Sequence, residues 1–188
     1  MTTSTGAFLK LEDLRRIAKE TKRKWTHIII HHSATPDRKF LSDFDAIKTF
    51  HMSYRYKGEI ITKEKSKELT AKGERITAPW LDIGYHFLIE YFGGELWLRQ
   101  GRSVESSGAH TVGMNGKAIG ICLVGNYDIT EPVEEQINLL ADSCRILTEE
   151  LEIPIQNIYP HHYYAAWKSC PGNKFNWTKL ILRIQCKG

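Results

Sequence analysis

The pattern of apolar and polar positions predicts four helices. They cover residues 10–24, 43–55, 131–151 and 174–185, and the first three carry apolar side chains at the spacing of one helix face. The longest has Pro132 and then acidic residues in its expected first turn, where a missing amide hydrogen and negative charge are both favourable. Its inner apolar stripe predicts that it packs on the main core.

Four other segments have the composition and length of strands. Residues 25–32 form a β-branched run that ends in two histidines, and residues 85–101 contain two apolar runs around a Gly-Gly pair, as in a β-hairpin. Residues 118–125 are almost wholly apolar, which predicts a central strand, and residues 153–162 predict another short one. Because strands and helices alternate, we expect an α/β fold: one domain with a central mixed β-sheet flanked by helices.

The pattern changes between residues 56 and 78, which are polar, rich in lysine and contain two glycines. We interpret this segment as an exposed insertion, either a hairpin or a mobile loop, with its charges in solvent. Residues 1–24 are expected to be an N-terminal extension containing the amphipathic helix. Residues 25–188 are expected to form the main domain, with the insertion at about 56–78.

Composition narrows the class of protein without identifying it. The 188 residues are 41% apolar and 26% charged, as in a soluble globular domain, and no apolar run reaches the ~18 residues of a membrane span. The first residues lack the apolar core of a signal peptide, so we expect synthesis in a cytosol and no membrane insertion. The net charge of +4 is compatible with a polyanion such as cell wall or nucleic acid. Since no nucleic-acid motif accompanies it, we expect no nucleic-acid partner.

The four cysteines, at positions 122, 144, 170 and 186, are not expected to form disulfides. A chain of this length can bury a core without covalent links, and a cytosol is reducing. Cys122 lies in an apolar strand and Cys144 in the inner stripe of a helix, so both are expected in the core. Cys170 differs because two histidines and a lysine stand within the same ten positions.

The segment HHYYAAWKSCPG, residues 161–172, has the residue types that bind zinc. His162 and Cys170 are eight positions apart. On a helix that spacing would separate them by about 12 Å, so both could hold one ion only if the segment folds back as a loop. A third ligand would come from elsewhere, and His31, near the end of the 25–32 strand, is the candidate. Three protein ligands leave one position open, as in catalytic zinc sites. The alternative is an exposed, aromatic-rich turn without a metal.

Four motifs, in order along the chain, resemble one known family. They are HIIIHHSAT, WLDIGYHFLI, GRSVESSGAHTVGMNGKAIGICLVGNYD and HYYAAWKSCPG. Together they are similar to the zinc-dependent N-acetylmuramoyl-L-alanine amidases of the type-2 amidase and peptidoglycan-recognition-protein family. Within it they resemble small phage endolysins such as the amidase-type coliphage lysozyme. The resemblance covers about residues 25–183 and implies that family's fold.

The resemblance implies that Zn2+ is the cofactor and assigns its ligands. The first is His31, the second is the histidine eight positions before the cysteine, which selects His162, and the third is Cys170. The chain has Pro160-His161-His162 where relatives often have Gly-His. His161 would be the ligand if the match were shifted by one residue.

The same comparison implies roles beyond the metal. Tyr85 and Lys168 correspond to the catalytic tyrosine and lysine, which would hydrogen-bond the reacting groups and stabilise the oxyanion. His110, Thr111 and Asn115 lie in the segment that would contact the glycan and the stem peptide. No glutamate or aspartate in the motifs is an evident general base.

The implied activity is hydrolysis of the amide between N-acetylmuramic acid and L-alanine of the stem peptide in bacterial peptidoglycan. As a phage endolysin, the protein would be made in the host bacterial cytoplasm. It would act on the cell wall after release through a separate membrane-permeabilising protein. We expect a monomer. Related phage lysozymes regulate an RNA polymerase, but this sequence gives no support for a polymerase partner.

Two other functions use the same motifs. One is a cytosolic amidase that recycles muropeptides and prefers soluble fragments to intact wall. The other is a protein that binds peptidoglycan without hydrolysing it, and the presence of Cys170 argues against this second alternative.

Overall fold

The structure is a computed structural model and describes residues 5–186. Its main feature is a sheet of six strands in the order β1-β6-β5-β7-β2-β8. The strands of this sheet are β1 (Phe8–Leu9), β2 (His27–His32), β5 (Phe87–Phe92), β6 (Glu95–Gln100), β7 (Ala118–Leu123) and β8 (Ile158–Pro160). The hairpin expected around the Gly-Gly pair is β5 and β6, and the almost wholly apolar segment is the central strand β7.

The sheet is mixed, which confirms the expected fold class. β2 runs parallel to both β7 and β8, and β5 runs parallel to β7 but antiparallel to β6. The strands β2 and β7 are buried on both faces of the sheet, which explains their nearly continuous apolar sequences.

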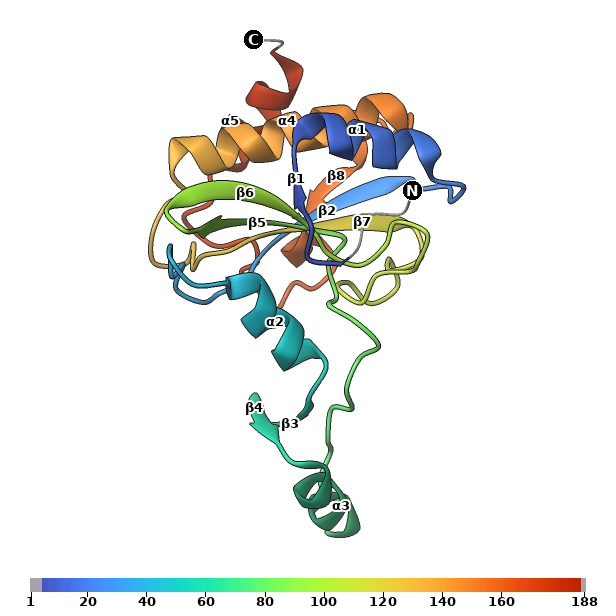
Figure 1. The fold of residues 1–188 in the computed structure, drawn as a ribbon, viewed down its shortest axis with the longest axis vertical. Helices are drawn as coiled ribbons and strands as arrows, with labels where there is room; N and C mark the ends of the chain where they lie inside the picture. Colours follow the sequence, from blue (N-terminus) through green and yellow to red (C-terminus); the bar gives the residue numbers. More distant parts are fainter. Residues whose placement is uncertain (1–4, 187–188) are drawn as a thin grey trace.

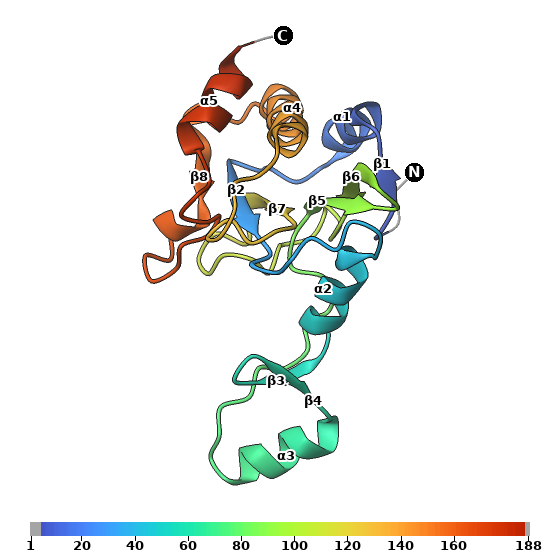
Figure 2. The same cartoon turned by 90° about the vertical axis from the view of Figure 1, so that its left-hand side faces the viewer.

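Helices cover the two faces of the sheet. On one face lie α1 (Leu11–Glu20), α4 (Glu134–Glu150) and α5 (Trp177–Gln185), and on the other lies α2 (Asp43–His51), as two perpendicular views show (Figures 1 and 2). Leu14 and Ile17 of α1 belong to the same hydrophobic cluster as the inner stripe of α4. Phe44 of α2 packs in a smaller cluster with Leu88 and Cys122 on the opposite face. No helix within residues 5–186 is both long and apolar enough to cross a bilayer.

All four expected helices are shorter in the structure, since α1 ends at Glu20 and α5 begins at Trp177. The helix expected at 43–55 ends at His51, because the chain then enters β3 (Tyr54–Tyr56), whose backbone is extended. The longest helix begins at Glu134 with Val133 as its N-cap, so Pro132 lies before the helix and not in its first turn.

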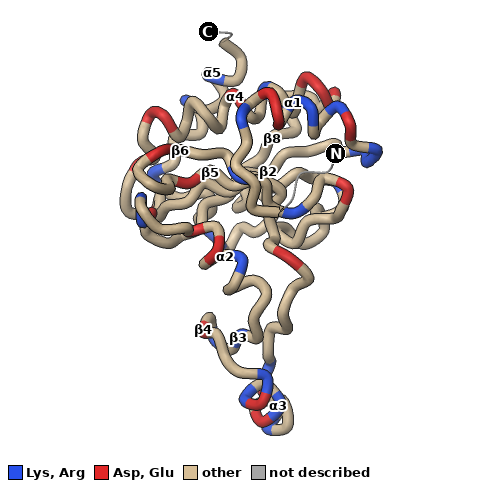
Figure 3. Tube along the Cα trace, viewed as in Figure 1, with Lys and Arg blue, Asp and Glu red and all other residues tan. Residues whose placement is uncertain are grey.

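Residues 54–78, here called the arm, project from the face of the sheet that carries α2 (Figures 1 and 2). The arm contains the hairpin of β3 and β4 (Glu59–Ile61), followed by α3 (Lys63–Ala71). Its α3 carries charges of both signs (Figure 3), and Glu68 forms ion pairs with Lys65 and Lys72. The first residues of the expected N-terminal extension (1–4) and the last residues of the expected main domain (187–188) lie outside the described residues.

Candidate metal centre

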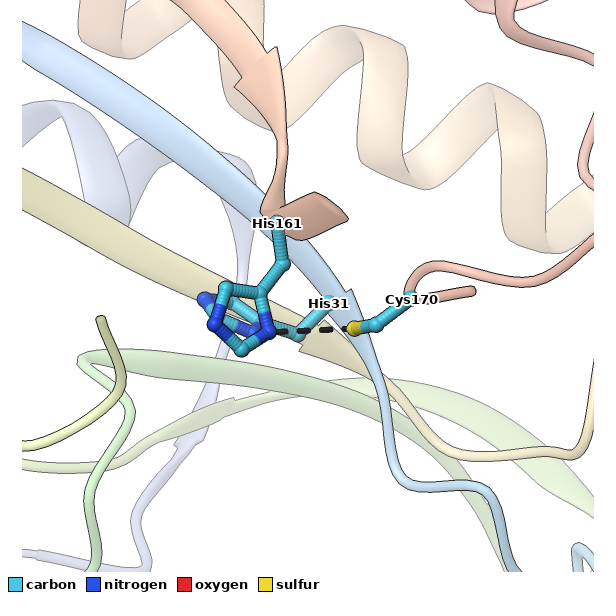
Figure 4. A group of neighbouring side chains, drawn as sticks. All are labelled: His31, His161 and Cys170. Atoms are coloured by element: carbon cyan, nitrogen blue, oxygen red, sulfur yellow. Dashed lines mark hydrogen bonds between the residues drawn. The ribbon is translucent and has the colours of Figure 1, made fainter. Parts of the chain in front are cut away.

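Three side chains that can ligate a metal converge beside the C-terminal ends of β2 and β8. His31, His161 and Cys170 each offer one ligand atom, and these atoms lie within 4.8 Å of one another. All three side chains are buried. Figure 4 shows that His31 comes from the end of β2, His161 from the turn after β8, and Cys170 from the loop that follows.

The sheet fixes the position of His31. Its strand β2 lies between β7 and β8, and His31 is opposite Cys122 in the parallel register. The His31 Nδ1 atom is 3.8 Å from the Cys170 sulfur, while its Nε2 atom is 3.0 Å from His110 Nδ1. One ring nitrogen therefore faces the cluster and the other faces away from it.

His110 determines which of those nitrogens of His31 carries the proton. The Nε2 atom of His110 is 3.2 Å from the carbonyl oxygen of Ala118, which can only accept a hydrogen bond. His110 must then carry its proton on Nε2, and its Nδ1 accepts from the Nε2–H of His31. The lone pair of His31 Nδ1 is left directed at the cluster, as a metal ligand requires.

The structure places His161 in the cluster, whereas the resemblance assigned His162 as the second ligand. β8 ends at Pro160, and the 3-10 turn η2 (His161–Tyr163) then directs the His161 ring inward. The His161 and His31 ring centroids are 4.4 Å apart. His162 is exposed, and its backbone N–H and its Nδ1 both lie within hydrogen-bond distance of the Cys170 carbonyl oxygen, at 2.8 and 3.1 Å. His162 thus closes the loop on Cys170, and His161 stands in the cluster.

The electrostatic environment keeps both cluster histidines neutral. Burial lowers the pKa of His31 well below its usual value, and the neighbouring His110, His161 and Lys168 lower it further. Burial and the charge of Lys168 lower the pKa of His161 to about 4. Burial raises the pKa of the Cys170 thiol to about 11, so this sulfur would ionise only beside a cation. Two neutral imidazoles and one thiol form a donor set that suits zinc.

Tyr85 and Lys168 line the same cavity as the three cluster residues. The Tyr85 ring centroid is 5.0 Å from that of His31, and burial raises the pKa of its phenol well above the usual value. Tyr85 is therefore a neutral hydrogen-bond donor. Lys168 is exposed on the loop, and its charge depresses the pKa of both cluster histidines. A cation therefore lies beside the cluster in the same cavity.

The three expected substrate contacts are already hydrogen-bonded within the protein. The Asn115 side chain accepts bonds from the backbone N–H groups of His110 and Thr111, at 2.7 and 2.8 Å. The hydroxyl of Thr111, which is buried, lies 3.0 Å from His110 Nδ1. These residues line a cavity of about 370 Å³ beside the cluster, but their polar atoms hold the loop and the His110 ring in place.

The cluster opens onto a larger cavity of about 620 Å³. Besides the three cluster residues, this cavity is lined by Tyr85, Lys168, Trp80, Trp167, His51 and Arg55. Sequence analysis gave His51 and Arg55 no functional role, because they lie at the junction between an expected helix and an expected insertion. The one available indication was the run of aromatic and basic residues after Phe50.

The comparison with protein families identifies the class of the chain. Residues 21–173 match the family described as N-acetylmuramoyl-L-alanine amidase. The chain belongs to this family, which confirms the resemblance inferred from the four motifs.

Individual relatives include viral and animal proteins. The chain is 45% identical over 113 residues to the endolysin of Escherichia phage T7, a match that covers 58% of this chain and 73% of that endolysin. It is 33% identical over 94 residues to the endolysin of Klebsiella phage KP32, covering 49% of this chain and 60% of the relative. Its 37% identity over 97 residues to N-acetylmuramoyl-L-alanine amidase of Mus musculus covers 50% of this chain but 17% of the mouse protein. The chain therefore spans less than two thirds of these last two relatives.

Solved structures agree on the fold. The chain matches the amidase LysC of Clostridium intestinale with a TM-score of 0.57 and 18% identity, covering 100% of this chain and 96% of the other. It matches bumblebee PGRP-SA with a TM-score of 0.56 and 21% identity, covering 95% and 89%. At these identities the likeness establishes a shared architecture and nothing more.

Proposed function

We propose that this protein hydrolyses the amide bond between N-acetylmuramic acid and L-alanine in bacterial peptidoglycan, with Zn2+ as its cofactor. The observation that carries this proposal is the convergence of His31, His161 and Cys170 within 4.8 Å, at the wall of a cavity that Lys168 also lines. Membership of the amidase family supports the reaction class. The solved complex of PGRP-LE with a monomeric diaminopimelic acid-type peptidoglycan, 20% identical with a TM-score of 0.54 and covering 93% of this chain and 82% of PGRP-LE, supports the substrate class.

The proposed ligands are His31 Nδ1, an imidazole nitrogen of His161 and the Cys170 sulfur. Bound there, zinc would polarise the carbonyl oxygen of the amide and make water a stronger nucleophile. The chain itself contributes the geometry. His110 holds His31 in the tautomer that presents Nδ1 to the cluster, and His162 holds the Cys170 carbonyl.

Lys168 and Tyr85 would act on the reacting groups. The Lys168 ammonium faces the cluster from solvent and would stabilise the negative charge that develops on the carbonyl oxygen. The neutral Tyr85 phenol, beside the His31 ring, would donate a hydrogen bond to the same region. The Asp128 carboxylate reaches the cavity, but it accepts from the Ser169 hydroxyl at 2.7 Å and the Asn173 N–H at 2.9 Å, so its role is to hold the loop.

We infer a biological role as a phage endolysin that acts on the host cell wall, on the basis of the matched phage proteins. In this role the protein would be made in the host cytoplasm and released through a separate membrane-permeabilising protein. It would work as a monomer, with peptidoglycan as its macromolecular partner.

Mass spectrometry of products released from purified peptidoglycan tests the function directly. We expect free stem peptides that begin at L-alanine, lost with a chelator and restored by zinc. Released sugar fragments would contradict the bond assignment. Zinc binding without any release would favour a non-catalytic binding protein, and activity on soluble muropeptides alone would favour a recycling amidase.

A further inference from the structure

Arg55 lies where the arm joins the main fold. It belongs to β3, and its backbone N–H and C=O both pair with Thr77, at 2.9 Å each. This bridge ties the two ends of the arm together. The position of Arg55 is therefore set by backbone pairing, although the arm itself projects away from the sheet (Figure 2).

Two aromatic rings enclose the guanidinium of Arg55. Its central carbon is 4.7 Å from the Phe50 ring centroid and 4.8 Å from the Trp80 ring centroid. Arg55 is only 8% exposed, and its Nε and Nη2 atoms are buried without a hydrogen-bond partner among residues 5–186. These two nitrogens form one edge of the guanidinium, the kind of edge that binds a carboxylate through two parallel hydrogen bonds.

An arginine in this condition lacks the partner that buried cations normally have. Buried charges are usually paired, because removing an ion from water is unfavourable, and two aromatic faces recover only part of that free energy. No carboxylate among the described residues lies within salt-bridge distance of Arg55, and Glu68 of the arm pairs with lysines of α3. Burial lowers the pKa of Arg55 below its usual value.

The same cavity contains Arg55 and the metal cluster. Arg55, Thr77 and Trp80 line the cavity of about 620 Å³ together with His31, His161 and Cys170. A row of aromatic rings connects Arg55 to the cluster. The ring centroids of Trp80 and His51 are 4.4 Å apart, those of His51 and Tyr85 are 5.5 Å apart, and those of Tyr85 and His31 are 5.0 Å apart. A substrate whose amide lies at the cluster would extend along this row toward Arg55.

We propose that Arg55 binds a carboxylate in the peptide part of the substrate, at the end of the cavity where the arm joins the main fold. The inference rests on the proposed amidase function and specifies which chemistry the arm adds to it. A neutral sugar would leave the cation unpaired, whereas a peptide carboxylate supplies both the charge and the acceptor geometry.

The test uses two soluble muramoyl peptides of identical sequence, one with free carboxyl groups and one with all of them converted to carboxamides. We expect the wild-type protein to cleave the acid with a kcat/KM at least about 10-fold above that of the amide, the effect of a charge-assisted hydrogen bond. Arg55→Gln should lower kcat/KM for the acid and leave the amide nearly unchanged, so the preference disappears. Arg75→Gln, which removes an exposed charge from the same arm, should keep the preference.

A purely structural role for Arg55 predicts something different. If Arg55→Gln reduces both substrates equally, the residue only supports the arm and the proposal is overturned. If the wild-type protein itself shows no preference for the acid, the proposal is overturned without any variant, even where Arg55→Gln does not fold.

Failure of the amidase function can be recognised separately. If the wild-type protein cleaves neither peptide, calorimetry on the same two peptides still measures the preference as a ratio of dissociation constants. Tighter binding of the acid by the wild-type protein but not by Arg55→Gln supports the carboxylate site. Equal binding of both peptides rejects it.

Discussion

The proposed metal site has two halves that are held by different kinds of structure. The sheet-borne half is His31 together with His110, to which it is hydrogen-bonded. Its strand β2 is paired with β7 on one side and β8 on the other. The loop-borne half is His161, Lys168 and Cys170, whose segment is closed by the two hydrogen bonds of His162 to the Cys170 carbonyl. A strand position is set by register, whereas a loop position depends on the number of residues between its ends. The two halves therefore differ in how they respond to substitution.

Alanine substitutions at the two adjacent histidines should have the largest and most different effects. We expect His161→Ala to lose bound zinc and to lower activity on the order of 10³-fold or more, because a ligand is removed. His162→Ala should retain zinc and most of the activity, since it removes one hydrogen bond of the loop. Zinc content by mass spectrometry and turnover of peptidoglycan measure both variants. The reverse result would restore His162 as the ligand.

Lys168 separates catalysis from metal binding within the loop-borne half. We expect Lys168→Ala to keep zinc and lower kcat by about 10²–10³-fold, the usual effect of removing one group that stabilises an oxyanion. Lys174→Ala is the matched control, because Lys174 is an exposed lysine a few residues beyond Cys170. Wild-type turnover by Lys168→Ala would remove this residue from the mechanism.

His110 tests the sheet-borne half. We expect His110→Leu to weaken zinc binding about 10- to 100-fold, because the His31 tautomer loses its partner. His110→Gln should recover part of the loss, since its amide oxygen can accept from His31 Nε2–H. Competition with a chromogenic chelator measures the affinity. Unchanged affinity in His110→Leu would mean that the register of β2 alone orients His31.

Replacing His86 should have a smaller effect, on how the free energy of unfolding depends on pH. Its buried ring accepts from the Gly120 N–H at 3.0 Å and donates to the Ser106 carbonyl, and burial lowers its pKa from 6.5 to about 4. Protonation therefore favours the unfolded chain, and the free energy of unfolding falls as pH drops from 6.5 toward 4. Between pH 7.5 and 5.5 we expect the wild-type protein to lose about 1 kcal/mol more than His86→Gln.

Urea unfolding with a chelator present measures this difference without a contribution from bound metal. An equal loss in both proteins would mean that His86 is not the group that titrates.

The two halves also differ in how well the sequence predicted them. His31 was located from an apolar run that ends in histidine, because a strand of that composition must be buried and must end at a sheet edge. The second histidine was chosen by counting back from Cys170, and this count crosses a loop. The structure shows that the fixed reference is the end of β8 at Pro160, from which His161 follows directly.

The arm also shows that local sequence does not predict contacts between distant residues. Its polar composition predicted exposure, and α3 is largely exposed. Nothing in that composition indicated that Arg55 would lie between Phe50 and Trp80 in the cavity of the metal cluster, because Trp80 is 25 residues further along the chain.

The sequence by itself determined the elements, the α/β class and the family, since hydrophobic period and short motifs are local properties of the chain. Only the tertiary structure decided which of two adjacent histidines faces the cluster, that His110 orients His31, and that Arg55 has no anionic partner among residues 5–186. These depend on distances between residues far apart in sequence, which packing fixes and local pattern does not.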